Sequence, residues 1–114
     1  MRQSRRKPRG RELVVFVTAS SKKEARAIAS DLVEARLAAC VTVVDVVGSI
    51  YRWKGKIEHS TETMLVIKTT TRRYADLERQ VKTLHSYDVP EIIALPVVRG
   101  SRAYLEWIRH ETKP

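Results

Sequence analysis

The stretch of sequence that decides the fold is CVTVVDVVGSIYRW (Cys40–Trp53), which is followed, after Lys54-Gly55, by KIEHSTETMLVIKTT (Lys56–Thr70). Both halves are rich in β-branched residues, which favour strands. The Lys-Gly pair between them can reverse the chain in a two-residue turn. Gly48 lies inside the first half and predicts a β-bulge there. The segment therefore predicts a long antiparallel hairpin of residues 40–53 and 56–70.

The segment before the hairpin predicts a strand followed by a helix. ELVVFVT (residues 12–18) is a short β-branched run that is typical of a buried strand. Ser21 and Glu24 have the spacing of a capping box, in which each side chain satisfies a free N–H group of the other. Apolar residues then recur at helical spacing, which predicts a helix from this cap to about Ala38.

The segment after the hairpin predicts a helix, a strand and a last helix. The second helix has one apolar face, formed by Tyr74, Leu77, Val81 and Leu84. EIIALPVV (residues 91–98) predicts a fourth strand, and it should lie at a sheet edge because Pro96 cannot donate a ladder hydrogen bond. Ser101 can cap a final helix. The order βαββαβ plus a C-terminal helix predicts an α+β, ferredoxin-like antiparallel sheet with the helices on one face.

The long hairpin is too long to be covered by its own chain. Strands of about 14 residues extend roughly 45 Å, whereas a first helix of about 18 residues covers only about 27 Å. Valines and Ile50 place apolar groups on both faces of the first long strand, which the ferredoxin-like order also puts at an edge. Another copy of the chain is expected to cover these surfaces.

Composition predicts one soluble domain with a basic tail. The chain has 114 residues and a net charge of +9, and six of its 22 Lys and Arg residues lie in residues 1–11 without any acid. We expect residues 1–11 to be a disordered tail and residues 12–114 to be a single domain. The single cysteine excludes an intrachain disulfide. No secretory or membrane-spanning pattern occurs, so we expect a cytoplasmic protein.

Five blocks of sequence, in order and at family spacing from about Leu13 to Arg109, resemble the CutA divalent-cation tolerance proteins. The blocks are Leu37–Val41, Ser49–Trp53 with Gly55–Glu58, Ile67–Thr70, Tyr87–Pro96 and Tyr104–Trp107. The resemblance implies a ferredoxin-like homotrimer that is linked to tolerance of copper and other divalent cations, with hairpins paired between subunits. It also implies an architecture related to the PII-type signalling proteins. A PII-like regulatory trimer that binds a small molecule is therefore the alternative function.

Two groups of residues match positions that the resemblance associates with binding. Cys40 and His85 match residues tied to metal binding, and they offer copper or zinc a thiolate and an imidazole nitrogen. Because ligands are few, any metal binding is expected to be weak, and no cofactor is expected to be obligatory. The second group lies around a cleft between subunits and is suited to a small anionic or zwitterionic ligand: Tyr51, Trp53, Lys68, Tyr87 and Glu91. The aromatic residues of this group could instead pack a subunit interface, with Lys68 paired to Glu91.

Two other classes of function lack their sequence signatures. No nucleophile–base pair and no G-x-S-x-G motif occurs, so we expect no enzymatic activity and assign no catalytic residue. RNA-recognition modules also have the order βαββαβ, but they carry aromatic residues on the third strand. Residues 56–68 contain no aromatic residue. The sequence therefore predicts no specific nucleic-acid partner.

Overall fold

The computed structural model describes residues 11–114, so the predicted basic tail lies outside the described residues apart from Arg11. These described residues form four strands and three helices, in the predicted order. In sequence they are β1 (Glu12–Ala19), α1 (Lys22–Glu34), β2 (Cys40–Trp53), β3 (Lys56–Thr70), α2 (Thr71–Leu84), β4 (Ile92–Pro96) and α3 (Arg102–Glu111). The predicted α+β, ferredoxin-like fold is confirmed. No helix of the described residues is both long and apolar enough to cross a membrane.

The sheet is antiparallel and has the strand order β2-β3-β1-β4. β1 lies at its centre, where its β-branched side chains are covered on the helical side. Among the described residues, β4 pairs only with β1 and ends at Pro96, so the predicted edge position of this proline is confirmed. The strand is shorter than the predicted 91–98, although the N–H of Val97 still donates to the Glu12 carbonyl at 2.9 Å.

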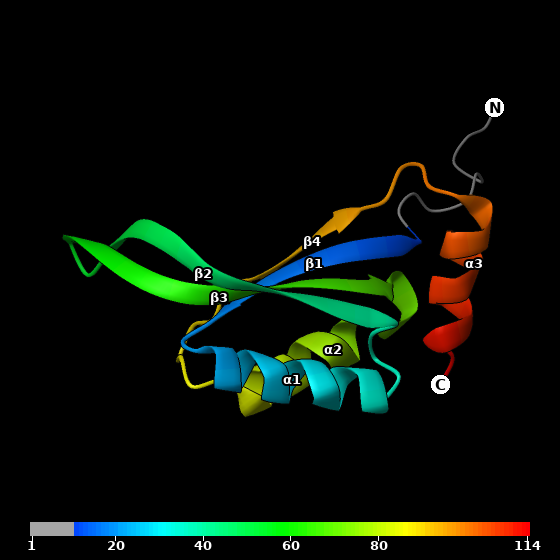
Figure 1. Ribbon diagram of the computed structural model, residues 1–114, viewed down its shortest axis with the longest axis horizontal. Coiled ribbons are helices and arrows are strands. Elements are labelled where there is room, and N and C mark those ends of the chain that lie inside the picture. The colour runs from blue at the N-terminus through cyan, green and yellow to red at the C-terminus, as the bar shows by residue number, and fades with distance from the viewer. Residues whose placement is uncertain (1–10) are drawn as a thin grey trace.

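The core lies between one face of the sheet and the helices α1 and α2 (Figure 1). Alternate residues of β1 and β3 point into it and meet the apolar stripes of the two helices. Its fully buried members include Val15, Val17, Ile28, Leu32, Leu65, Ile67, Leu77 and Val81. Leu84 was predicted to share the apolar face of α2, but it is the last residue of that helix and is 38% exposed.

α1 ends at Glu34, four residues before the predicted end at Ala38. The cause is Arg36, which adopts a left-handed backbone conformation with φ 60°. Its guanidinium donates to the carbonyls of His110 and Lys113, each at 3.0 Å. These long-range contacts, which helical periodicity does not report, stop the helix and turn the chain toward β2.

The long hairpin has the predicted bounds but not the predicted bulge. Lys54 (φ 51°) and Gly55 (φ 82°) form the two-residue turn, whose positive φ values match the twist of the flanking strands. The register shifts between Val44 and Val47, so the bulge lies at residues 45–46, with Val46 at φ 49°. The prediction of a bulge at Gly48 was wrong, since Gly48 pairs with Thr61 in regular register.

The face of the sheet opposite α1 and α2 is apolar and largely open within one chain. Val44, Ile93 and Leu95 lie on it and are 37%, 53% and 50% exposed. α3 crosses only the end of the sheet where β1 begins, and the hairpin extends beyond all three helices at the other end (Figure 1). Because α1 has 13 residues, or about 20 Å, the overhang of the hairpin is longer than the sequence suggested.

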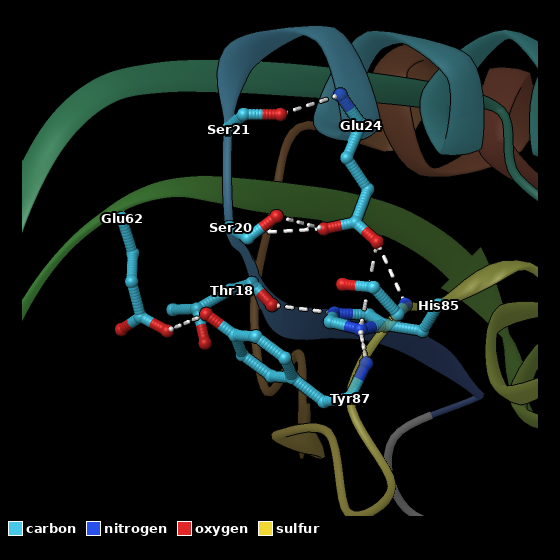
Figure 2. A network of polar contacts seen from close by, with 8 residues as sticks. Thr18, Ser20, Ser21, Glu24, Glu62, His85 and Tyr87 are labelled. Atoms are coloured by element: carbon cyan, nitrogen blue, oxygen red, sulfur yellow. Dashed lines mark hydrogen bonds and ion pairs between the residues drawn. The ribbon is translucent and has the colours of Figure 1, made fainter.

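The N-terminus of α1 is tied to the loop after α2 through Glu24 (Figure 2). Ser21 caps the helix as predicted, accepting from the Glu24 N–H at 3.1 Å. The Glu24 carboxylate accepts instead from the N–H and hydroxyl of Ser20, at 2.9 and 2.8 Å, and from the Ser86 N–H at 2.7 Å. Partial burial would raise the pKa of this carboxyl, but these hydrogen bonds outweigh it and lower the pKa to about 2.

Glu24→Gln is expected to lower the free energy of unfolding at neutral pH by about 2 kcal/mol, because hydrogen bonds to a charged group are lost. The folded pKa is below the unfolded value, so the carboxylate stabilises the fold fully above pH 4.5. This contribution disappears as the pH falls toward 2. Urea unfolding at several pH values should therefore show the wild type and the variant converging in acid.

Glu34→Gln is the matched control, since Glu34 is exposed at the other end of α1. This change should alter stability by no more than about 0.5 kcal/mol at any pH. A wild-type advantage over Glu24→Gln that persists unchanged at pH 2 would show that the hydrogen bonds do not depend on the charge of Glu24.

Candidate functional site

A cleft of about 560 Å³ lies where the long hairpin leaves the body of the protein. Three strands and the loop after α2 contribute to it. The lining residues are Ser49, Ile50, Tyr51 and Trp53 from β2, Glu62 from β3, Thr18 from β1, and residues 87–89 with Glu91. Tyr51 and Trp53 are 43% and 46% exposed in it. The cleft therefore combines accessible aromatic faces with the side chains of three acids.

The bulge in β2 is what turns the outer residues of this strand toward the cleft. Val44 pairs with Met64, but Val47 pairs with Glu62, so β2 uses three residues where β3 uses two. Cross-strand partners share a face of the sheet. Beyond the bulge, the odd-numbered residues of β2 consequently share the face of Glu62, among them Ser49, Tyr51 and Trp53. Asp45, within the bulge, pairs with Lys22 at 3.2 Å.

Glu62 is buried beside the cleft and holds two of its neighbours in place. The hydroxyl of Ser49 donates to one carboxylate oxygen at 2.6 Å. The hydroxyl of Tyr87 donates to the other at 2.9 Å (Figure 2). Burial and then the hydrogen bond to Glu62 raise the pKa of Tyr87 to about 12. Tyr87 therefore stays protonated at physiological pH and fixes the loop against β3.

His85 is buried next to the cleft and acts as a structural residue within one chain. Its Nε2 lies 2.7 Å from the Thr18 carbonyl, and its Nδ1 accepts from the Tyr87 N–H at 3.1 Å. This pattern requires the proton on Nε2. The imidazole and Tyr87 rings are 4.7 Å apart. Both ring nitrogens are therefore engaged, and the side chain is not exposed to solvent.

Cys40 lies toward the opposite end of the sheet. It pairs with Lys68, which pairs with Val14, whereas His85 contacts Thr18 at the far end of β1. Four residues of strand separate Val14 from Thr18, or about 13 Å. The structure thus does not bring Cys40 and His85 together within one chain. Residues 11–114 also contain no group of three His, Cys, Asp or Glu side chains that could hold a metal ion.

Four of the five residues predicted around a cleft do line it, namely Tyr51, Trp53, Tyr87 and Glu91. Lys68 does not, and its predicted pairing with Glu91 is absent among the described residues. Its ammonium lies 3.8 Å from the Cys40 sulfur, which is also 3.6 Å from the Tyr104 hydroxyl. Tyr104 in turn stacks on Trp107, with ring centroids 5.5 Å apart.

The charge of the cleft within one chain differs from the charge expected for the predicted anionic or zwitterionic ligand. It contains the acids Glu62, Asp88 and Glu91 and no basic side chain. Aromatic faces with nearby carboxylates favour a cationic ligand over an anionic one. Glu62 and Asp88 were missed by the sequence analysis. Glu62 carries no local signal, because its role depends on the loop after α2 crossing β3.

The comparisons with known proteins agree with this architecture. The family model described as CutA1 divalent ion tolerance protein matches residues 13–111. The divalent-cation tolerance protein CutA of Thermus thermophilus is 50% identical over 101 residues, which are 89% of this chain and 98% of that protein. Human protein CutA is 46% identical over 98 residues, 86% of this chain but 55% of that protein. The chain thus spans about half the length of some curated relatives, including Arabidopsis CutA at 56%.

Solved structures give the same assignment. The Cut A1 structure from Thermus thermophilus has a TM-score of 0.88 and 50% identity, covering 90% of this chain and 99% of that one. CutA1 from Shewanella sp. SIB1 has a TM-score of 0.90 and 40% identity, covering 94% and 100%. A family model that spans nearly the whole described chain, relatives of this identity and the shared fold lead to one conclusion: the chain belongs to the CutA1 divalent ion tolerance protein family.

Proposed function

We propose that the protein acts as a homotrimer in divalent-cation tolerance in the cytoplasm. The observation that most directly supports a homotrimer is the open apolar face of the sheet, on which Ile93 and Leu95 are about half exposed. Apolar patches of this kind mark interaction surfaces. The comparisons lend no support to a PII-like regulatory trimer, which we do not propose. The absence of enzymatic activity stays a prediction.

The edges of the sheet support a closed assembly. Within residues 11–114, β2 pairs only with β3, which leaves the other side of its backbone without a partner strand. Ile50 and Ile57, on the overhanging part of the hairpin, are 71% and 54% exposed. A ring with threefold symmetry uses each such surface once, whereas an open chain of copies would form fibres. Neighbouring subunits would then also cover the hairpin and border the cleft.

Light scattering should give three times the chain mass of 13.1 kDa over a wide range of dilution. Val44→Glu should yield aggregated or unfolded protein, because it places a charge on the open face that the partner covers. Val33→Glu is the matched control: Val33 has a similar exposure, 42% against 37%, but lies on α1. This variant should remain a trimer. A folded wild-type monomer at micromolar concentration would contradict the proposal.

We further propose that copper binding is weak and depends on Cys40 without His85. The donor set does not fit a closed metal site in one chain, since both nitrogens of His85 are hydrogen-bonded. Cys40 offers a half-buried thiol, but its polar neighbours are the Lys68 ammonium and the Tyr104 hydroxyl. A soft thiolate is a preferred ligand of Cu(I), and one thiolate alone gives little affinity.

Cys40→Ser should weaken Cu(I) binding by about tenfold or more, as measured by competition with a chromogenic chelator. His85→Ala should leave Cu(I) affinity unchanged but lower the thermal midpoint, because the Thr18 carbonyl and the Tyr87 N–H lose their partner. His59→Ala, at an exposed position of β3, should alter neither quantity. Equal losses of Cu(I) affinity in Cys40→Ser and His85→Ala would instead indicate a site shared between subunits.

A further inference from the structure

A second hollow, of about 460 Å³, lies at the end of the sheet where β1 begins and α2 starts. We call it the basic hollow, because its lining consists of four cationic residues and three threonines. The cations are Arg11, Arg72, Arg109 and Lys113. It lies far from the aromatic cleft, since Thr70 and Glu62 are eight residues apart on β3, or about 26 Å. None of these residues lines the cleft, and none is among those considered above for copper binding.

The positive charge of the basic hollow is largely uncompensated. Arg109 pairs with the buried carboxylate of Glu12. Arg11, Arg72 and Lys113 have no carboxylate within 4.0 Å among residues 11–114. Like charges that converge on one concavity repel one another, so this arrangement is unfavourable without an anion.

The start of α2 adds unused hydrogen-bond donors to this charge. Thr70 is the N-cap, but its hydroxyl makes no capping bond, so the N–H groups of Arg72 and Arg73 have no acceptor from the cap. The first turn contains no acid, although the positive end of a helix dipole favours one. Arg73 itself is turned away, donating to the Ala35 and Arg36 carbonyls.

Thr70 is an independent sign that the basic hollow accepts a ligand. The residue is 5% exposed and lines the hollow. Its hydroxyl makes no capping bond and no other hydrogen bond to a residue of 11–114. A nearly buried hydroxyl normally has a partner. This hydroxyl is therefore available to a molecule in the basic hollow.

We propose that the basic hollow binds the phosphate group of a small phosphorylated molecule. The Thr70 hydroxyl and the free N–H groups at the start of α2 donate to the phosphate oxygens, as helix N-termini commonly do. Arg11, Arg72 and Lys113 neutralise its charge, and an arginine can donate two parallel hydrogen bonds to phosphate. Because the cations surround a concavity and do not form an extended row, a compact anion fits better than a duplex backbone.

The proposal is tested by calorimetric titration of the full chain with inorganic phosphate and with glycerol 3-phosphate, at constant ionic strength. Saturable binding is expected for the wild type, with a rise in thermal midpoint. Arg72→Gln should weaken binding by about tenfold. Arg26→Gln, which removes the same charge from an exposed position of α1, should bind like the wild type.

Thr70→Val separates ligand binding from stability. The hydroxyl makes no capping bond, so its loss should leave the thermal midpoint of the free protein unchanged while weakening phosphate binding severalfold. Equal weakening by Arg72→Gln and Arg26→Gln would overturn the proposal in favour of unspecific charge. Failure of both probes to bind would also overturn it. A third result would also overturn it: the protein binds a labelled DNA duplex in a salt-sensitive way, Arg72→Gln abolishes this binding, and neither phosphate probe binds.

Discussion

The sheet has two apolar faces, of which α1 and α2 cover one while α3 covers only one end of the other, and the rest of this structure depends on that constraint. α1 and α2 supply the apolar stripes that bury Val15, Val17 and Ile67, and no element within residues 11–114 does the same for Ile93 and Leu95. The covered face gives one chain a stable core. The uncovered face leaves apolar side chains in water, and the proposed homotrimer would bury them. In that proposal the fold of one chain and the assembly of three answer the same requirement.

The sequence was most informative where local chemistry decides the conformation. The bounds of β2 and β3, the turn at Lys54 and Gly55 and the Ser21 cap follow from β-branching, left-handed turn geometry and a hydroxyl at an N-cap. The sequence was misleading where contacts between distant residues decide the conformation. α1 stops early because Arg36 is held by carbonyls near the C-terminus of the chain. The bulge lies at Val46, although glycine is the residue that usually indicates one.

The residues of the candidate site were likewise predicted where local sequence decides and missed where distant contacts decide. Residue types and family resemblance identified the aromatic side chains of the cleft, since Tyr51 and Trp53 are adjacent alternate residues of one strand. They did not show how far apart residues lie along the sheet. Cys40 and His85 were therefore predicted to share a metal site, although about 13 Å of β1 separates Val14, which is in register with Cys40 through β3, from Thr18, which contacts His85. Glu62 and Glu24 were missed as organisers of the loop after α2, because only the tertiary fold brings that loop to them.

The bulge at residues 45–46 also determines which insertions and deletions the outer part of β2 can tolerate. Removal of one of these two residues would leave Val47 opposite Glu62 and restore regular alternation, so Ser49, Tyr51 and Trp53 would keep the face of Glu62. Removal of both residues would bring Val47 opposite Thr63 in a regular ladder, and Ser49, Tyr51 and Trp53 would move to the opposite face while Ile50 took their place. The bulge is therefore a position at which the strand carries one residue more than the pairing needs. A single deletion is expected to be harmless to the aromatic walls of the cleft at this position and to reverse them if it falls between the bulge and Tyr51.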